Sequence, residues 1–132
     1  MAYRKRKSCR SHGERELKEI FEELNIRYMK EVKFDECKSP KGKHLRFDFF
    51  LPDYNLLIEY QGVHHYKPIN KYYRAQIVHR KTVEHDKLKL QFCNEYNIPL
   101  LQIAYWDREK IREIVLGRIG ELYGSKDLPL NT

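Results

Sequence analysis

The sequence predicts an α/β fold in which helices flank a central, mixed, four-stranded sheet. Two observations predict it. Segments with helical periodicity alternate with short apolar runs in the order helix, three strands, helix, strand, helix. Only turns separate the first three strands, whereas the fourth strand follows a helix, as in a meander with a helical crossover. The chain has 132 residues, 41% of them hydrophobic, which suits one domain with a buried core.

The first helix is predicted to begin at Ser11. This serine can cap the helix, and Glu14 stands three residues later, as in a capping box. Apolar side chains then recur at helical spacing, at Leu17, Ile20, Phe21 and Leu24. We expect the helix to end near Asn25.

Three strands are predicted next, at Ile26 to Phe34, Leu45 to Leu51 and Leu56 to Gln61. The intervening segments, 35–43 and 52–55, are rich in the residue types that form turns, among them proline, aspartate and glycine. The sequence therefore predicts an antiparallel meander after the first helix.

The segment from His64 to Lys81 contains no acidic residue and mixes basic with aromatic side chains. Its basic residues are Lys67, Lys71, Arg74, Arg80 and Lys81, and its tyrosines are Tyr66, Tyr72 and Tyr73. We expect a long, partly helical excursion over the surface that contacts a nucleic-acid backbone. A solvated loop anchored by its tyrosines is the alternative interpretation.

The remaining elements are a second helix at Val83 to Tyr96, a buried strand at Leu100 to Tyr105, and a third helix capped by Asp107. The sequence thus predicts one domain at residues 11–124. A basic flexible arm precedes it at 1–10, and a tail follows it at 125–132.

The formal net charge of +7 favours an anionic partner, but charge alone does not separate nucleic acid from a membrane surface or from simple solubility. Part of the charge lies in the arm, at Arg4, Lys5, Arg6 and Lys7, which we expect to contact DNA phosphates; a plain solvated arm is the alternative. No apolar stretch reaches membrane-spanning length, so we expect a cytoplasmic protein with no membrane partner. The three cysteines form no Cys-x-x-Cys pair, which argues against a structural zinc site.

The second and third strands are predicted to bring two carboxylates together. If residues 52–55 form the loop, Leu51 pairs with Leu56. Counting back from that pair, Asp48 lies opposite Glu59, and both side chains point to one face of the sheet. A slip of one residue in register would remove this arrangement.

Opposed carboxylates destabilise a sheet unless a cation compensates them. Oxygen ligands suit Mg²⁺, with Mn²⁺ as a substitute, and such a metal can support phosphodiester hydrolysis. Two exposed carboxylates, each neutralised by a lysine, are the alternative. The neighbouring side chains Phe47, Phe49 and Leu51 are predicted to point to the other face.

The stretch from Arg46 to Tyr66, RFDFFLPDYNLLIEYQGVHHY, resembles the core of the PD-(D/E)XK nuclease superfamily. More narrowly, it is similar to the branch of very-short-patch-repair and phage homing endonucleases. Asp86 to Trp106 also resembles that branch, as does the helix start with Ser11, Gly13 and Glu14. The resemblance implies a restriction-endonuclease-like, three-layer α/β/α fold and a Mg²⁺-dependent deoxyribonuclease.

By this resemblance, Asp48 and Glu59 are the metal carboxylates. Glu14 matches an additional acid of the family, which serves a second metal or a metal-bound water, and this role competes with its place in the capping box. His65 matches a histidine of the branch and is expected to act as general acid or base near neutral pH. His64 is its rival for that role.

Gln61 departs from the superfamily, which usually carries lysine two residues after the second acid. We expect Lys89, on the second helix, to supply the missing positive charge, with Lys87 as the alternative. Asp86, on one face with Lys89, would orient the histidine or reach the metal through water; solvated helix residues are the alternative for both. Asp53 follows a proline, as in the superfamily's name, but lies in a predicted turn and is not expected to be catalytic.

The sequence leaves several functions open. The first is an endonuclease that cuts or nicks duplex DNA and is encoded by a phage or mobile element. A Holliday-junction or other branched-DNA resolvase belongs to the same class and would be expected to form a homodimer. A non-catalytic DNA-binding module is an alternative because Gln61 replaces lysine, although two acids beside phosphates argue against it. A zinc or histidine–metal centre ranks last, since the histidine spacing matches no motif.

Overall fold

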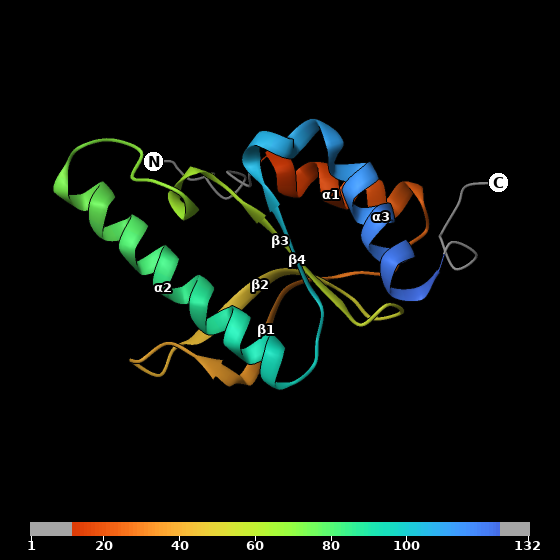
Figure 1. Ribbon diagram of the computed structural model, residues 1–132, viewed down its shortest axis with the longest axis horizontal. Helices are drawn as coiled ribbons and strands as arrows, with labels where there is room; N and C mark the ends of the chain where they lie inside the picture. The colour runs from red at the N-terminus through yellow and green to blue at the C-terminus, as the bar shows by residue number, and fades with distance from the viewer. Residues whose placement is uncertain (1–11, 125–132) are drawn as a thin grey trace, which may run out of the picture.

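The computed structural model describes residues 12–124 (Figure 1). The arm with Arg4, Lys5, Arg6 and Lys7, the expected cap Ser11, and the tail at 125–132 lie outside the described residues. In chain order the elements are α1 (His12–Glu23), β1 (Met29–Lys38), β2 (His44–Leu51), β3 (Leu56–Gln61), the 3-10 helix η2 (Val63–His65), α2 (Tyr73–Glu95), β4 (Leu100–Ala104), the 3-10 helix η3 (Tyr105–Lys110) and α3 (Ile111–Tyr123).

The four strands form one mixed sheet in the order β1-β2-β3-β4. The first three are antiparallel neighbours joined by turns, whereas β4 pairs parallel to β3. Parallel pairing requires a crossover between β3 and β4, and α2 makes it (Figure 1). The predicted element order and the mixed four-stranded sheet are therefore confirmed.

Helices cover both faces of the sheet. α1 and α3 pack together over one face, and α2 lies over the other (Figure 1). The core on the α1/α3 side includes Leu17, Phe21, Phe49, Ile58 and Val115. The core on the α2 side consists of Cys37, Leu45, Phe47, Leu57, Phe92 and Cys93, with both cysteines free. Because β3 is covered on both faces, nearly all of its side chains are buried.

Gly13 allows α1 to approach the sheet closely. A Cβ atom built on Gly13 would lie 2.2 Å from Cε1 of the Tyr60 ring, far inside van der Waals contact. Tyr60 follows Glu59 on β3, so α1 touches the strand that carries one of the predicted catalytic acids.

The β2–β3 hairpin has the predicted register. Leu51 pairs with Leu56, and Phe49 pairs with Ile58. Asn55 closes the turn with a φ of 48°, a left-handed conformation that asparagine tolerates better than most residues.

The prediction that Phe47 shares a face with Phe49 is wrong. Phe47 belongs to the core under α2, whereas Phe49 belongs to the core under α1 and α3. The β1–β2 ladder is interrupted between these two residues, where Glu31 and Asp48 do not pair. Glu31, on β1 at this point, has a φ of 54°, a left-handed conformation that is uncommon for glutamate.

The start of β1 also differs from the prediction. Asn25 ends α1 with a φ of 58°, and the Ile26 N–H donates to the Phe21 carbonyl at 2.8 Å, as in a Schellman motif. Ile26 is buried as part of this helix end. The strand therefore begins at Met29 and continues to Lys38.

Two helix boundaries differ as well. α2 begins at Tyr73 rather than at Val83. The prediction missed its first turns because they are mostly exposed and show no apolar stripe. Asp107 does not cap α3; it lies inside η3, and Lys110 precedes the first residue of α3. Within the described range, no helix is both long and apolar enough to cross a membrane.

Candidate active site

Asp48 and Glu59 lie side by side on the two central strands. Phe49 pairs with Ile58, the last residue pair of the β2–β3 ladder, and Asp48 and Glu59 are the next residues along the two strands. The backbone N–H of Tyr60 donates to Asp48 Oδ2 at 2.9 Å, which ties this carboxylate to β3. Glu59 is only 3% exposed. The two acids thus lie just beyond the last pair of the ladder, close enough for the charge of Asp48 to act on Glu59.

Lys89 reaches this pair from α2. Its Nζ lies 2.5 Å from Glu59 Oε2 and 5.4 Å from the centroid of the Phe47 ring, and its side chain is 11% exposed. The other oxygen of Glu59, Oε1, is buried and has no hydrogen-bond partner among the described residues. Lys89, rather than Lys87, is therefore the lysine that lies beside the acids.

Burial disturbs the ionisation of both acids. It raises the pKa of Glu59 to about 7; Lys89 opposes this effect, and the negative charge of Asp48 adds to it. Burial also raises the pKa of Asp48, against the Tyr60 hydrogen bond and the charge of Lys89. Both carboxyl groups are therefore harder to ionise than usual. A cation bound beside them would stabilise their ionised forms.

His65 and Asp86 form a second pair. His65 comes from η2, and its Nδ1 lies 2.6 Å from Oδ2 of Asp86 on α2. Both side chains are largely buried, and Asp86 Oδ1 has no hydrogen-bond partner among the described residues. The predicted partnership of the two residues is thus present. Gly62 has extended backbone angles (φ −76°, ψ −169°), so the turn toward His65 does not depend on glycine's conformational freedom.

Gln61 lies beside a group of aromatic rings whose grouping the sequence did not predict. Its side chain is buried, and the Tyr66 hydroxyl donates to its Oε1 at 2.7 Å. The Tyr66 ring packs against Trp106 with centroids 4.5 Å apart, and against Tyr105. Trp106 is 61% exposed. These contacts join segments that are distant in the chain and carry no local motif.

The donor set fits Mg²⁺ better than it fits a metal held entirely by protein. Among residues 12–124, no group of three or more histidine, cysteine, aspartate or glutamate side chains is placed to hold a metal ion. Glu14, half-buried on the first turn of α1, does not complete such a group with the two acids, so its catalytic role stays a prediction. Mg²⁺ commonly takes only one or two carboxylates, together with waters and substrate phosphates. Asp48 and Glu59, with the unpartnered Oε1, suit that kind of site.

The predicted nucleic-acid contacts spread over a wide surface. Lys67 and Lys71 lie in the loop between η2 and α2, and Arg74, Arg80 and Lys81 lie on α2. All five side chains are exposed.

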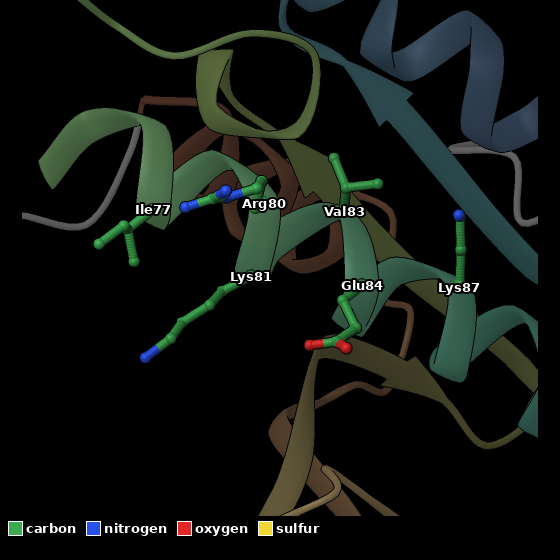
Figure 2. A pocket seen from close by; sticks show the side chains of 6 residues that line it. All are labelled: Ile77, Arg80, Lys81, Val83, Glu84 and Lys87. Atoms are coloured by element: carbon green, nitrogen blue, oxygen red, sulfur yellow. The ribbon is translucent and has the colours of Figure 1, made fainter. Parts of the chain in front are cut away.

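A hollow of about 620 Å³ runs along the outer side of α2 (Figure 2). It is lined by Ile77, Arg80, Lys81, Val83, Glu84 and Lys87. Helical geometry places these residues on a different side of α2 from Asp86 and Lys89, which face the sheet. The structure therefore does not bring Arg80 and Lys81 to the carboxylates; the body of α2 separates them.

Asp53 lies in the β2–β3 turn and belongs to another interaction. Its carboxylate accepts two hydrogen bonds from the Arg27 guanidinium, at 2.6 and 3.1 Å, which lower its pKa. As expected from the turn, Asp53 is not part of the acid pair.

Comparisons with known proteins add a viral relative. The uncharacterized protein 307L of invertebrate iridescent virus 6 is 32% identical over 77 residues. The match covers 54% of this chain and 39% of the viral protein, so the chain spans well under half the length of that relative. No protein-family model matches the chain, and no solved structure matches it. This likeness assigns the chain to no family of known activity.

Proposed function

We propose that this protein is a metal-dependent DNA endonuclease that hydrolyses phosphodiester bonds with Mg²⁺, or with Mn²⁺ as a substitute. The observation that carries the proposal is the buried pair of Asp48 and Glu59, with Lys89 beside it and one Glu59 oxygen left without a partner. Burying two adjacent acids is unfavourable, and a divalent cation between them would reverse this penalty. The mixed α/β fold, with helices on both faces, is compatible with the restriction-endonuclease-like fold of the PD-(D/E)XK superfamily.

The two acids and the lysine have separate tasks in this reaction. Asp48 and Glu59 would hold Mg²⁺, which polarises a phosphate oxygen and lowers the pKa of bound water when it is present. Lys89 Nζ supplies, from α2, the positive charge that Gln61 does not provide from β3.

His65 has one ring nitrogen committed to Asp86. An ionised carboxylate only accepts hydrogen bonds, so Nδ1 of His65 carries a hydrogen and points it at Asp86. Nε2 is the atom left for proton exchange with the attacking water or the leaving oxygen. His65 is also near enough to Asp48 for its charge to act on that carboxyl group.

A DNA substrate fits the charge and surface of the protein. The net charge is +7, and the exposed Lys67 and Lys71 lie in the loop that follows η2, which carries His65. The exposed ring of Trp106 offers a stacking surface for a base near Gln61. The viral relative supports an origin in a virus or mobile element.

A plasmid assay tests this proposal. Supercoiled DNA should be cut by the wild-type protein with Mg²⁺ and left intact with a chelator. Asp48→Asn and Glu59→Gln should each abolish cleavage while DNA binding is kept or strengthened, because each removes negative charge beside the phosphates. Asp53→Asn is the matched control, since it changes an aspartate outside the acid pair and should cut normally. Full activity in either site variant would refute the assignment.

Two alternative functions could use the same site and the same basic surface. A branched-DNA resolvase would cut a four-way junction in preference to linear, supercoiled or single-stranded DNA, and would be dimeric in solution. A non-catalytic binding module is favoured by one observation, the Lys89–Glu59 ion pair, which partly neutralises the site without a metal. Calorimetric titration with Mg²⁺ in the absence of DNA separates the module from the enzyme, because a module has no reason to bind the metal.

A further inference from the structure

Two histidine contacts attach η2 to α2. His79 Nδ1 lies 2.6 Å from the backbone carbonyl oxygen of His64, and Asp86 holds the side chain of His65. His79 and Asp86 are seven positions apart on α2, so they lie two turns apart on the same face. Within residues 12–124, these are the hydrogen bonds that join the two elements.

The direction of the His79 bond is fixed by chemistry. A carbonyl oxygen can only accept, so His79 Nδ1 must carry a hydrogen and donate it. Both the neutral Nδ1–H tautomer and the protonated ring can do this. The contact therefore does not require His79 to change its charge.

This bond completes the restraint of a single peptide unit. The carbonyl of His64 and the N–H of His65 belong to the same planar group. The His65 N–H donates to the Gly62 carbonyl at 3.2 Å, and the His64 carbonyl accepts from His79. With both ends held, the plane is fixed, and so is the direction in which the His65 side chain leaves the backbone.

We infer that His79 is a positioning residue for His65, which it places by holding the His64–His65 peptide unit against α2. The inference rests on the proposed function for its effect on catalysis, but not for its effect on structure. Without the His79 donor, the His65–Asp86 hydrogen bond is the one left between η2 and α2 among the described residues, and the His65 ring can swing about it. His79 touches no reacting group, so its contribution passes entirely through His65.

The first test needs no activity. In the wild-type protein the Nδ1–H of His65, held by Asp86, should give one sharp signal in the histidine side-chain NMR spectrum. His79→Phe keeps a ring of similar size without the donor and should shift or broaden that signal. His79→Asn returns an N–H near the position of Nδ1 and should restore it. An unchanged His65 signal in His79→Phe, in a protein that stays folded by circular dichroism, overturns the inference.

The second test uses cleavage kinetics. His79→Phe should lower kcat by roughly 10²-fold, the cost typical of a misplaced catalytic group, with KM unchanged. His79→Asn should recover most of that loss, and the matched control His85→Phe, on the same helix, should cut as the wild type does. In the background of His65→Ala, His79→Phe should have no additional effect. Full additivity of the two substitutions would show that His79 does not act through His65.

The proposed endonuclease function and the positioning role of His79 can be disproved separately. If the wild-type protein cuts no DNA, the proposed function fails, and the NMR experiment still decides whether His79 orders His65. If cleavage requires His65 but is indifferent to His79→Phe, the proposed function stands and the positioning role is wrong.

Discussion

Burial and Lys89 act in opposite directions on the pKa of Glu59. Burial raises its pKa to about 7, whereas Lys89, at 2.5 Å, favours the ionised form. The folded protein therefore holds a proton on Glu59 more tightly than the unfolded chain does. That proton stabilises the metal-free fold fully below the ordinary pKa of glutamate, and the stabilisation is lost as the pH rises through about 7.

We expect the metal-free protein to lose roughly 3 kcal/mol of unfolding free energy from this group between about pH 5 and pH 8. Mg²⁺ should restore stability mainly at the higher pH, because it competes with the proton; its affinity should rise about tenfold per pH unit up to the pKa and then level off. Denaturant unfolding with and without Mg²⁺ at both pH values measures this. Equal stabilisation by Mg²⁺ at both pH values would mean that Glu59 is not a ligand.

Lys89 is the lysine on which the chemistry depends. Lys89→Gln removes the main group that opposes burial, so the pKa of Glu59 should rise further and the pH optimum of cleavage should move to higher pH. We expect kcat/KM near neutral pH to fall roughly 10²-fold. A pH–rate profile of the variant measures both effects.

Lys87→Gln is the matched control for that experiment. Lys87 lines the hollow on the outer side of α2 (Figure 2), so its loss should weaken DNA binding at most and leave kcat unchanged. Equal losses of kcat in the two variants would show that Lys89 has no special place in the site.

At the scale of elements, the β2–β3 hairpin could be predicted from the sequence. Turn residues fix its loop and its register from Leu51–Leu56 to Phe49–Ile58, and that register predicts Asp48 and Glu59 as near neighbours, although alternation failed for the face of Phe47. Asp86 is predicted from the resemblance to the nuclease branch, and Lys89 is preferred over Lys87 as the missing cation; helix spacing places these two residues on one face.

Other features depend on tertiary geometry that no local pattern encodes. Glu31 adopts a left-handed conformation that is uncommon for glutamate, where the β1–β2 ladder skips the Glu31–Asp48 pair, and Phe47 on β2 lies in the core opposite to the one predicted. The first turns of α2 are mostly exposed, so nothing in their polarity revealed a helix. Tyr66 and Trp106 meet only because β4 and η3 return to the end of β3.

The contact between α1 and β3 gives a prediction at this scale. In Gly13→Ala, the new methyl group would lie 2.2 Å from the ring of Tyr60, whose backbone N–H holds Asp48. We expect a loss of roughly 1–3 kcal/mol in the free energy of unfolding, together with slower cleavage. Chemical denaturation and the plasmid assay measure the two effects.

Gly117→Ala provides the control for this substitution. Gly117 lies within α3, and a Cβ there would meet nothing within 4 Å, so alanine should stabilise the helix by about 0.5–1 kcal/mol. If Gly13→Ala were equally stabilising, the close approach of α1 to Tyr60 would be wrong.

At the scale of the whole molecule, positive charge is distributed well beyond the site. Arg80 and Lys81 lie across α2 from the acids, and the arm adds Arg4, Lys5, Arg6 and Lys7 outside the described residues. Such charges act on the affinity for DNA and on its dependence on salt, while chemistry depends on the buried groups.

Deleting residues 1–10 should therefore weaken binding to unrelated DNA sequences about equally and flatten the salt dependence, by roughly one unit of slope per lost phosphate contact. The double variant Arg80→Gln, Lys81→Gln should behave similarly, and neither change should alter kcat at saturating DNA. Fluorescence of Trp106, the single tryptophan, measures binding. An unchanged slope after deletion would mean that the arm does not touch DNA.

The acid pair, Lys89 and the His65–Asp86 pair all come from one uninterrupted stretch, from Asp48 in β2 to Lys89 in α2, whereas Glu14 lies outside it on α1. α1, β4 and α3 cover and extend the sheet around it. The consequence is genetic. A recombination event that carries this stretch carries the acid pair, Lys89 and the His65–Asp86 pair together, and the flanking segments can diverge as long as they still bury the opposite face of the sheet. The same stretch can thus be inherited by chains of quite different length and ends.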